Sequence, residues 1–326
     1  MSRPLSPPRV VALSGGIGGA KLALGLYHAV PADALCVIVN NGDDFEPFGL
    51  SVSPDLDTVL YTLAGLDNPE TGWGRRDETW TFMRVLESLG GETWFRLGDG
   101  DLALHVERTR RLQAGEPLSA IMGDVARRWG VAARILPMSD EPVRTVVETD
   151  QGTMPFQEYF VARRCAPRVV AIRFEGAESA RPQAGALAAL ADAEEAIVIC
   201  PSNPYLSVDP ILALPELRAA LAAAPAPVIA VAPIVGGRAI KGPTAKIMTE
   251  LGLPVSPAPV AAHYGELLDG FVLDRRDAAL EREIAVPALV TDTIMRHRAD
   301  KVRLAHDVLD FARSLGARGD RRRASR

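Results

Sequence analysis

Short apolar runs alternate with amphipathic stretches along most of the chain. Runs rich in Val, Ile and Leu indicate buried strands at residues 9–13, 35–39, 196–200 and 228–231. Helical patterns occur at about 22–30, from near Asp57, at 80–89 and at about 215–223. Because strands that alternate with helices form parallel βαβ units, this order predicts an α/β fold with a doubly wound, mainly parallel, Rossmann-like sheet.

The pattern changes between about residues 136 and 195. Two strand-like segments, 143–148 and 154–162, flank an Asp-Gln-Gly turn, and residues 168–174 form a third candidate strand. Hairpin chemistry within a βαβ pattern predicts a small inserted α+β subdomain over 136–195 that roofs a cleft.

Composition narrows the class of protein. The 326 residues are 48% hydrophobic and 24% charged, which is enough for one large core. The net charge of −5 gives no reason to expect nucleic acid or an acidic membrane surface as a partner. No apolar run reaches the roughly 18 residues that span a bilayer, and the three cysteines show no metal-ligand spacing. We expect a cytoplasmic protein with one α/β catalytic domain at residues 9–310 and disordered tails at 1–8 and 317–326.

Four carboxylates follow the strand at 35–39, in two clusters bounded by glycine and proline: Asp43, Asp44, Asp55 and Asp57. Ligands of open α/β sheets bind where the strands end. Mg²⁺ is usually held there by one or two carboxylates together with substrate phosphates. The clusters therefore favour a Mg²⁺ site. The alternative is that these residues only form turns and cap the next helix.

A glycine-rich segment, S-G-G-I-G-G-A-K, follows the first strand and contains Gly15, Gly16, Gly18 and Gly19. It is not a dinucleotide fingerprint, because Lys21 replaces the last glycine, and it lacks the spacing of a Walker loop. Glycines permit close backbone approach, and N–H groups at a helix N-terminus attract phosphate. We predict a phosphate-binding loop. A tight βα turn packed for structural reasons is the alternative.

Three later segments carry further candidate contacts. Arg96 precedes a Gly-Asp-Gly-Asp loop and can hold a planar or phosphorylated ligand by bidentate contacts; a solvated surface arginine is the alternative. Ser202 and Asn203 follow the strand at 196–200 and suit a nucleotide, although helix capping explains the same residue types. Gly236 and Gly237 lie near Arg238, Lys241 and Lys246, a combination that suits a diphosphate.

The sequence contains no motif that is typical of acyl transfer or of zinc catalysis. The five histidines form no H-E-x-x-H pattern, and no G-x-S-x-G elbow is present. A metal-assisted displacement at phosphorus fits the acidic, glycine-rich and basic segments better.

Taken in order, the motifs resemble the 2-phospho-L-lactate transferase family of deazaflavin coenzyme F-420 biosynthesis (CofD, called FbiA in actinobacteria). The resemblance runs over about residues 10–293. Its strongest motifs are S-G-G-x-G-G-A-K, N-x-G-D-D and S-P-D-L-D-T-V-L-Y-T-L. The match continues through G-W-G-x-R-x-E-T-W, L-G-D-G-D-L-A, P-M-S-D and P-S-N-P.

The resemblance implies Mg²⁺-dependent transfer of a phospho-acid, phospholactate or phosphoenolpyruvate, from its GMP-activated diphosphate to the ribityl hydroxyl of the deazaflavin Fo. GMP is then released, and a homodimer is implied. The matching motifs imply Asp43 and Asp55 as metal ligands, and Asp57 and Arg96 as Fo contacts. The glycine loop and Lys21 would hold phosphate and stabilise charge. The guanine nucleotide would contact Ser202, Asn203 and the region of Gly236 and Gly237.

Asp57 has two possible roles in this scheme: it orients the Fo hydroxyl, or it deprotonates it. One departure from the family concerns the inserted hairpin, which reads Met-Pro-Phe-Gln from Met154 where a histidine is expected before Phe-Gln. The acid-recognising pocket can therefore differ. Two alternatives remain open. One is a non-catalytic, nucleotide-sugar-binding regulator of the YvcK-like branch, and the other is a Mg²⁺-dependent nucleotidyltransferase that consumes GTP.

Overall fold

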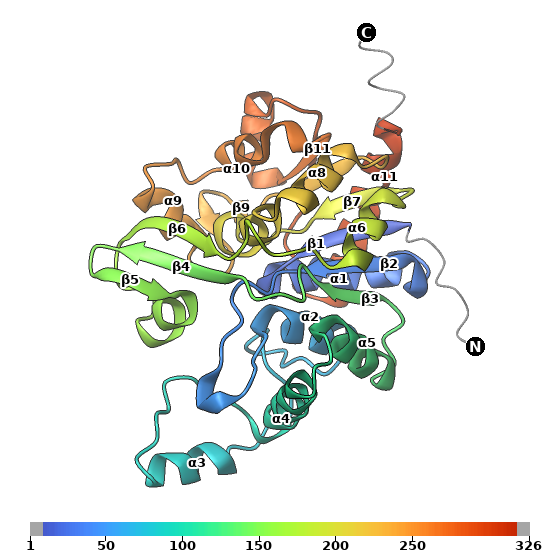
Figure 1. The fold of residues 1–326 in the computed structure, drawn as a ribbon. Helices are drawn as coiled ribbons and strands as arrows, with labels where there is room; N and C mark the ends of the chain where they lie inside the picture. The colour runs from blue at the N-terminus through green and yellow to red at the C-terminus, as the bar shows by residue number, and fades with distance from the viewer. Residues whose placement is uncertain (1–8, 318–326) are drawn as a thin grey trace, which may run out of the picture.

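A seven-stranded parallel sheet forms the centre of the computed structural model, which describes residues 9–317 (Figure 1). The strand order is β12-β11-β8-β7-β1-β2-β3. The strands are β1 (Val10–Ser14), β2 (Leu35–Val39), β3 (Arg134–Pro137), β7 (Ala196–Ile199), β8 (Val228–Val231), β11 (Gly270–Asp274) and β12 (Ala288–Thr291). The chain winds from β1 to β2 and β3, then returns to the other side of β1. The predicted doubly wound α/β fold is therefore confirmed, with its switch point between β1 and β7.

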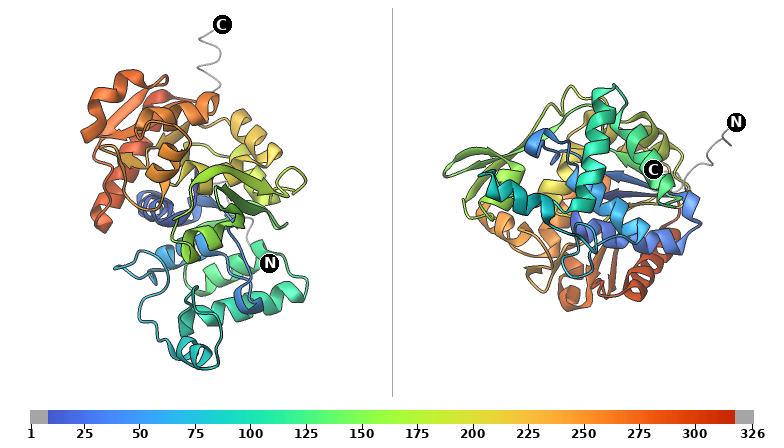
Figure 2. Two further views of the ribbon diagram at one scale, coloured as in Figure 1. Left: turned by 90° about the vertical axis from the view of Figure 1, so that its left-hand side faces the viewer. Right: turned by 90° about the horizontal axis from the view of Figure 1, so that it is seen from below.

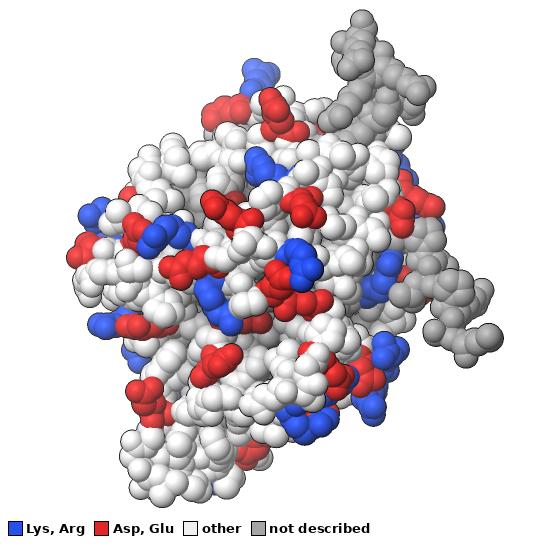
Figure 3. All heavy atoms as spheres, viewed as in Figure 1, with Lys and Arg blue, Asp and Glu red and all other residues white. Residues whose placement is uncertain are grey.

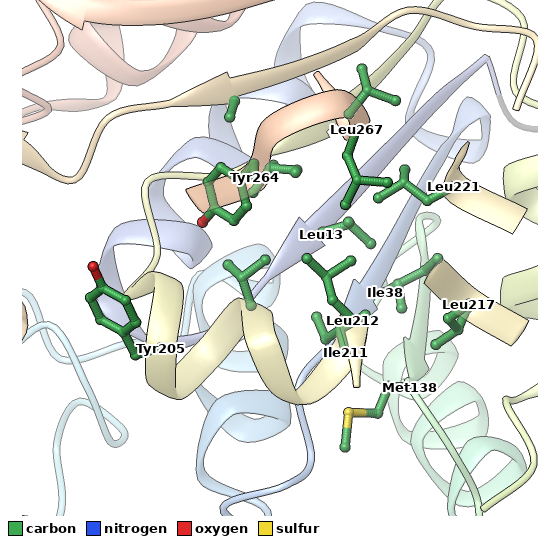
Figure 4. Close-up of a cluster of buried hydrophobic side chains, with 14 of the residues drawn as sticks. Leu13, Ile38, Met138, Tyr205, Ile211, Leu212, Leu217, Leu221, Tyr264 and Leu267 are labelled. Carbon is green, nitrogen blue, oxygen red and sulfur yellow. The ribbon is translucent and has the colours of Figure 1, made fainter. Parts of the chain in front are cut away.

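The central strands are buried on both faces because helices cover both sides of the sheet. Every residue of β1, β2, β7 and β8 is buried, as their continuous aliphatic composition predicts. Alternate residues face opposite sides, so Leu13 and Ile38 enter one hydrophobic cluster while Val10 and Val37 enter the other. Figure 4 shows the first cluster, where Leu13 and Ile38 lie near Ile211.

The helices divide between the two faces. The cluster that contains Val10 includes residues of α1 (Gly16–Ala29), α2 (Pro54–Ala64), α5 (Leu118–Arg128) and α11 (Arg298–Leu315). The cluster that contains Leu13 includes residues of α6 (Ala184–Ala191), α7 (Asp209–Leu212), α8 (Pro215–Ala223), α9 (Thr244–Glu250) and α10 (Pro257–Tyr264). Helix α4 (Asp99–Gln113) lies beside α5 and adds Leu104 to the cluster that contains Val10, whereas α3 (Thr81–Ser88) extends away from the sheet (Figures 1 and 2).

A three-stranded antiparallel sheet, β5-β4-β6, lies beside the main sheet. Its strands are β4 (Arg144–Thr149), β5 (Gly152–Pro155) and β6 (Val169–Glu175). The predicted strand over 154–162 is wrong beyond Pro155, because a π-helical turn, η3, covers Glu158–Ala162. Phe156 stacks on Phe160 four residues later, which is helical spacing. The inserted subdomain at 136–195 stays a prediction, and the predicted tails lie outside the described residues except for residue 317.

Two helices begin earlier than their sequences indicate. Helix α1 begins at Gly16 and not near residue 22, so most of the predicted glycine loop is the first turn of a helix. Helix α2 begins at Pro54, where proline is favoured at the first helical position. Asp55 and Asp57 therefore occupy a helical turn and not a loop, at the end of the helix where the backbone dipole favours negative charge.

The contact between α1 and α11 depends on Gly25. A Cβ at this position would lie 2.1 Å from the backbone oxygen of Lys301, which cannot rotate away. Alanine is a better helix former than glycine by about 1 kcal/mol, but overpacking a core costs about 1–3 kcal/mol. We expect Gly25→Ala to lower the free energy of unfolding by about 1–2 kcal/mol, measured by urea denaturation.

A matched control is Gly123→Ala in α5, where the added Cβ would meet only a side-chain atom of Arg127 at 3.7 Å. This variant should be as stable as the wild type or slightly more stable. Equal stabilities for Gly25→Ala and the wild type would show that α1 and α11 adjust to the extra methyl group.

Within residues 9–317, none of the helices combines the length and the apolar character needed to span a bilayer.

Candidate active site

A cavity of about 670 Å³ opens at the carboxyl edge of the main sheet. Its wall includes Gly15 after β1, Asp43 after β2, Ser202 after β7 and Ala232 after β8. The segments after β1 and β7 meet at the switch point, where the Gly15 N–H donates a hydrogen bond to Ser202 Oγ at 3.1 Å. The cavity therefore lies where open α/β sheets bind their ligands.

Two buried carboxylates, Asp43 and Asp55, are held together by Asn40. Its amide donates to Asp43 Oδ1 at 3.2 Å and to Asp55 Oδ2 at 2.9 Å. The Gly16 N–H donates to Asp55 Oδ1 at 2.7 Å. Burial raises the pKa of Asp55 to about 6, and burial together with Asp55 raises the pKa of Asp43 well above its usual value. The site thus gathers negative charge that a cation would offset.

The donor set suits a magnesium ion that is completed by a ligand. Across residues 9–317, no three His, Cys, Asp or Glu side chains come together as a metal site. Mg²⁺ is usually held by one or two carboxylates, with waters and substrate phosphates as the other ligands. Asp43 and Asp55 both line the cavity, so oxygens of a bound phosphate can reach them. The residues present therefore fit Mg²⁺.

Asp44, the fourth acid of the sequence cluster, lies outside the cavity wall. Its Oδ2 accepts a hydrogen bond from Ser53 Oγ at 2.8 Å. Burial raises the pKa of Asp44 to about 8. For this residue, the turn-forming alternative describes the structure better than metal binding.

Three of the four glycines, Gly15, Gly18 and Gly19, pack too closely for a Cβ, and Gly16 has a positive φ of 62°. An added Cβ on Gly18 would lie 2.3 Å from the backbone oxygen of Pro201, and one on Gly19 would lie 2.5 Å from Ser202 Oγ. Gly15, Gly16 and Gly18 also line the cavity, but Gly19 does not. Direct phosphate contact by Gly19 is therefore not supported, because its open side faces protein.

Lys21 lines the cavity one turn into α1. Burial, followed by the charges of Lys301 and Lys241, lowers its pKa. Lys241 lies on the same cavity wall. A ligand with several negative charges would relieve the repulsion between these ammonium groups.

Asp57 lines the cavity but is already paired. Arg108, fully buried on α4, donates from Nη1 to Asp57 Oδ2 at 3.1 Å and from Nη2 to Oδ1. His105 lies between two acids, with Nδ1 3.8 Å from Asp57 Oδ2 and Nε2 3.5 Å from Asp101 Oδ1. The Tyr61 hydroxyl donates to Asp101. Arg108 therefore contacts both oxygens of Asp57 and fixes the orientation of its carboxylate.

No functional role for Asp101, His105 or Arg108 was predicted from the sequence. Their spacing, i, i+4 and i+7, places them on one face of α4 and is the signal that was available. The side chains around Asp57 are buried or nearly so, and they belong to Tyr61, Asp101, His105 and Arg108. Burial lowers the pKa of His105 to about 4, so this imidazole is neutral at physiological pH.

Arg96 lies at an aromatic end of the cavity. Its guanidinium is 4.4 Å from the centroid of the Trp80 ring. The neighbouring Trp94 and Phe95 also line the cavity, and its wall further includes Trp73, Phe156 and Phe160. Figure 3 shows few charged side chains on the lobe around α3, which adjoins this end. The predicted contact of Arg96 with a planar ligand is compatible with this position.

Ser202 and Asn203 line the cavity as predicted, next to the π-helical turn η4 (Pro204–Val208). Asn203 Oδ1 caps this turn by accepting from the Tyr205 N–H at 3.0 Å. Its buried Nδ2 has no partner among the described residues. The side chain thus serves as a cap for η4, and the residue lies at the cavity wall.

Gly236 and Gly237 do not line the cavity. They form the turn of a hairpin between β9 (Ile234–Val235) and β10 (Arg238–Ala239), with φ of 57° and 71°. The Gly236 N–H donates to Asp277 Oδ2 at 2.9 Å. Hairpin geometry therefore accounts for both glycines, and direct nucleotide contact by them is not supported.

The residues that follow this hairpin lie in two different environments. Lys241, Gly242 and Thr244 line the cavity. Lys246 turns away from it and donates to the Pro167 oxygen at 2.8 Å. The segment as a whole still reaches the site, through residues other than the predicted glycine pair.

Fold and cavity together define a Rossmann-like α/β protein whose site suits a large ligand with a phosphorylated, anionic part and a planar part. The chain belongs to the 2-phospho-L-lactate transferase family CofD, which matches residues 10–308. It is 46% identical over 298 residues to a phosphoenolpyruvate transferase of Streptomyces griseus, covering 87% of this chain and 93% of that protein. It is 40% identical over 311 residues to a 2-phospho-L-lactate transferase of Methanopyrus kandleri, covering 94% and 98%.

A structural comparison supports the fold alone. A UPF0052 family protein from Bacillus halodurans superposes with a TM-score of 0.60 at 15% identity, covering 93% of this chain and 99% of that one. The shared architecture extends over nearly the whole chain.

Proposed function

We propose that this protein transfers a phospho-acid from its GMP-activated diphosphate to the ribityl hydroxyl of the deazaflavin Fo and releases GMP, as a step of coenzyme F-420 biosynthesis. The observation that carries the proposal is the layout of the single cavity described above. A carboxylate pair, Lys21 and the aromatic end with Arg96 all face it. They come from motifs by which the chain resembles its family. The transferase names of its relatives agree with this activity.

The donor diphosphate would occupy the end of the cavity near β1 and β7. Asp43 and Asp55 would hold Mg²⁺, which, when bound, neutralises charge on the diphosphate oxygens. Lys21 lies on the same wall and would stabilise the charge that develops on departing GMP. Ser202 and Asn203, which both line the cavity, would contact the guanine nucleotide.

The acceptor would occupy the aromatic end. Rings of the wall and the Arg96 guanidinium suit the flat deazaflavin, because aromatic faces and guanidinium groups stack on planar systems. Asp57, fixed by Arg108, would orient the ribityl hydroxyl toward phosphorus. Orientation of this kind is a large part of catalysis in phosphoryl transfer.

The phospho-acid would be recognised beside the inserted hairpin. Phe156 and Gln157 line the cavity there, and Gln157 Nε2 donates to Asp43 Oδ2 at 3.3 Å. The relatives include a phosphoenolpyruvate transferase and a 2-phospho-L-lactate transferase, so we propose either phosphoenolpyruvate or phospholactate as the acid. A cytoplasmic location and a homodimer remain part of the proposal.

Arg96→Met tests the acceptor end of the cavity. We expect Fo to bind about tenfold more weakly, because a desolvated guanidinium–ring interaction contributes about 1–2 kcal/mol. Equilibrium titration followed by deazaflavin fluorescence would measure this. The matched control is Arg84→Met, an exposed arginine of α3 outside the cavity wall, which should bind Fo as the wild type does. If the wild type bound a nucleotide sugar but not Fo, the result would favour the regulatory alternative.

A further inference from the structure

The hydroxyl that attacks phosphorus must lose its proton, and Asp57 is poorly suited to take it. Its two oxygens both accept hydrogen bonds from Arg108, a permanently charged group. The carboxylate would have to give up this pairing to become protonated. A second acid faces the same cavity without an arginine partner.

We propose that Asp101 is the proton acceptor for the incoming hydroxyl, while Asp57 only positions it; this rests on the proposed function. Asp101 lies in the first turn of α4 and lines the cavity. Its backbone N–H donates to Glu78 Oε1 at 2.8 Å, which fixes the residue in place. The side chain keeps 14% of its surface exposed, so one part of it remains open to the cavity.

The contacts of Asp101 suit a group that gains and loses a proton. The Tyr61 hydroxyl donates to Oδ1, and His105 Nε2 lies 3.5 Å from the same oxygen. No hydrogen bond is formed by the other oxygen, Oδ2, within the described part of the chain. This oxygen can accept a proton without breaking an existing contact.

The charges around Asp101 place its proton affinity in a useful range. Burial raises the pKa of Asp101 to about 7, and the negative charges of Asp57 and Glu78 act in the same direction. The hydrogen bond from Tyr61 and the charge of Arg108 act in the opposite direction. His105, the remaining neighbour, is neutral because burial lowers its pKa to about 4. A general base works best when its pKa lies near the working pH.

Proton transfer to Asp101 and displacement of GMP need no reactant other than Fo and the GMP-activated phospho-acid. The O–H bond of the acceptor breaks, its proton moves to the Asp101 carboxylate, and its electron pair forms the new O–P bond. The bond between phosphorus and the GMP oxygen breaks, and GMP leaves with that electron pair. The Asp101 proton then passes to solvent through the cavity.

Asp101→Asn is the direct test. We expect kcat to fall by about 10²–10³, within the range of general-base catalysis, and the KM for Fo to change less than threefold. In the wild type, kcat should fall as the pH drops below about 7, because the protonated acid cannot accept a proton. This limb of the pH profile should be absent in Asp101→Asn. A purely structural role would leave the limb in place.

Glu107→Gln is the matched control, because this exposed acid lies on the same helix and pairs with Arg110. It should keep the wild-type rate and pH profile. Asp101→Glu retains the carboxyl group, and we expect it to recover at least tenfold of the lost rate with a displaced pH limb. This second variant decides the question if Asp101→Asn does not fold.

The assignment of Asp101 would be overturned if the wild type transfers the phospho-acid and Asp101→Asn keeps the wild-type rate and the wild-type pH limb. An undisplaced pH limb in Asp101→Glu would overturn it as well. Failure of the wild type to transfer the phospho-acid to Fo would instead overturn the proposed function. The two failures are therefore distinguishable in one set of assays.

Discussion

Replacing Asp55 with asparagine is expected to lower Mg²⁺-dependent transfer by at least about 10³-fold, because a metal ion can contribute several kcal/mol to transition-state stabilisation. Asparagine keeps the shape of the side chain and an oxygen that can accept from the Gly16 N–H. It removes the negative charge that a divalent cation requires. Initial rates of GMP release across a Mg²⁺ titration would measure the effect.

The fold should survive this substitution. Burial already disfavours the charged form of Asp55 and raises its pKa to about 6, so the position tolerates a neutral side chain, at the cost of the acceptor that Asp55 Oδ2 offers to the Asn40 amide at 2.9 Å. Asp33→Asn, at an exposed position before β2, is the control and should keep full activity. An Asp55→Asn enzyme that turned over at the wild-type rate with the same Mg²⁺ dependence would contradict the proposed metal site.

Arg108→Met is expected to lower the free energy of unfolding by about 3–5 kcal/mol, because it leaves a buried charge without its partner. Arg108 is fully buried and Asp57 nearly so, with side-chain exposures of 0% and 7%. The double variant Asp57→Asn/Arg108→Met removes both charges and should recover most of the loss. Urea denaturation of the wild type, both single variants and the double variant forms the complete cycle.

Arg110→Met provides the comparison for the buried pair. This arginine lies on the same helix, but it is exposed and pairs with Glu107 at the surface. Surface ion pairs contribute about 0–1 kcal/mol, so little stability should be lost. If Arg108→Met were equally mild, water would have to reach Asp57 in the folded protein, and its fixed orientation would no longer be explained.

Local patterns in the sequence predicted the elements that local physics determines. Strands β2 and β8 and helix α8 have the predicted bounds, Leu35–Val39, Val228–Val231 and Pro215–Ala223. Each has a composition that suits only one element and ends at turn-forming residues. Strands β3, β11 and β12 were missed, because short runs of mixed composition do not separate strand from helix.

The site was predicted in outline because its acids and glycines follow strands at one sheet edge. Its internal pairing was not predictable, since the partners are distant in sequence. Arg108 and Asp57 are 51 residues apart, and Asn203 owes its free amide to the turn that it caps. Nucleotide contact by the hairpin glycines stays a prediction, because a tight turn and a phosphate contact favour the same residue type.

The most direct test of the central proposal is a chromatographic transfer assay. Purified protein would be mixed with Fo and Mg²⁺ and, in parallel, with guanylylated phospholactate, phosphoenolpyruvate or 3-phosphoglycerate. We expect equal amounts of GMP and a more acidic deazaflavin with at least one donor, and no product when EDTA is added. Absence of both products with every donor would contradict the proposed function.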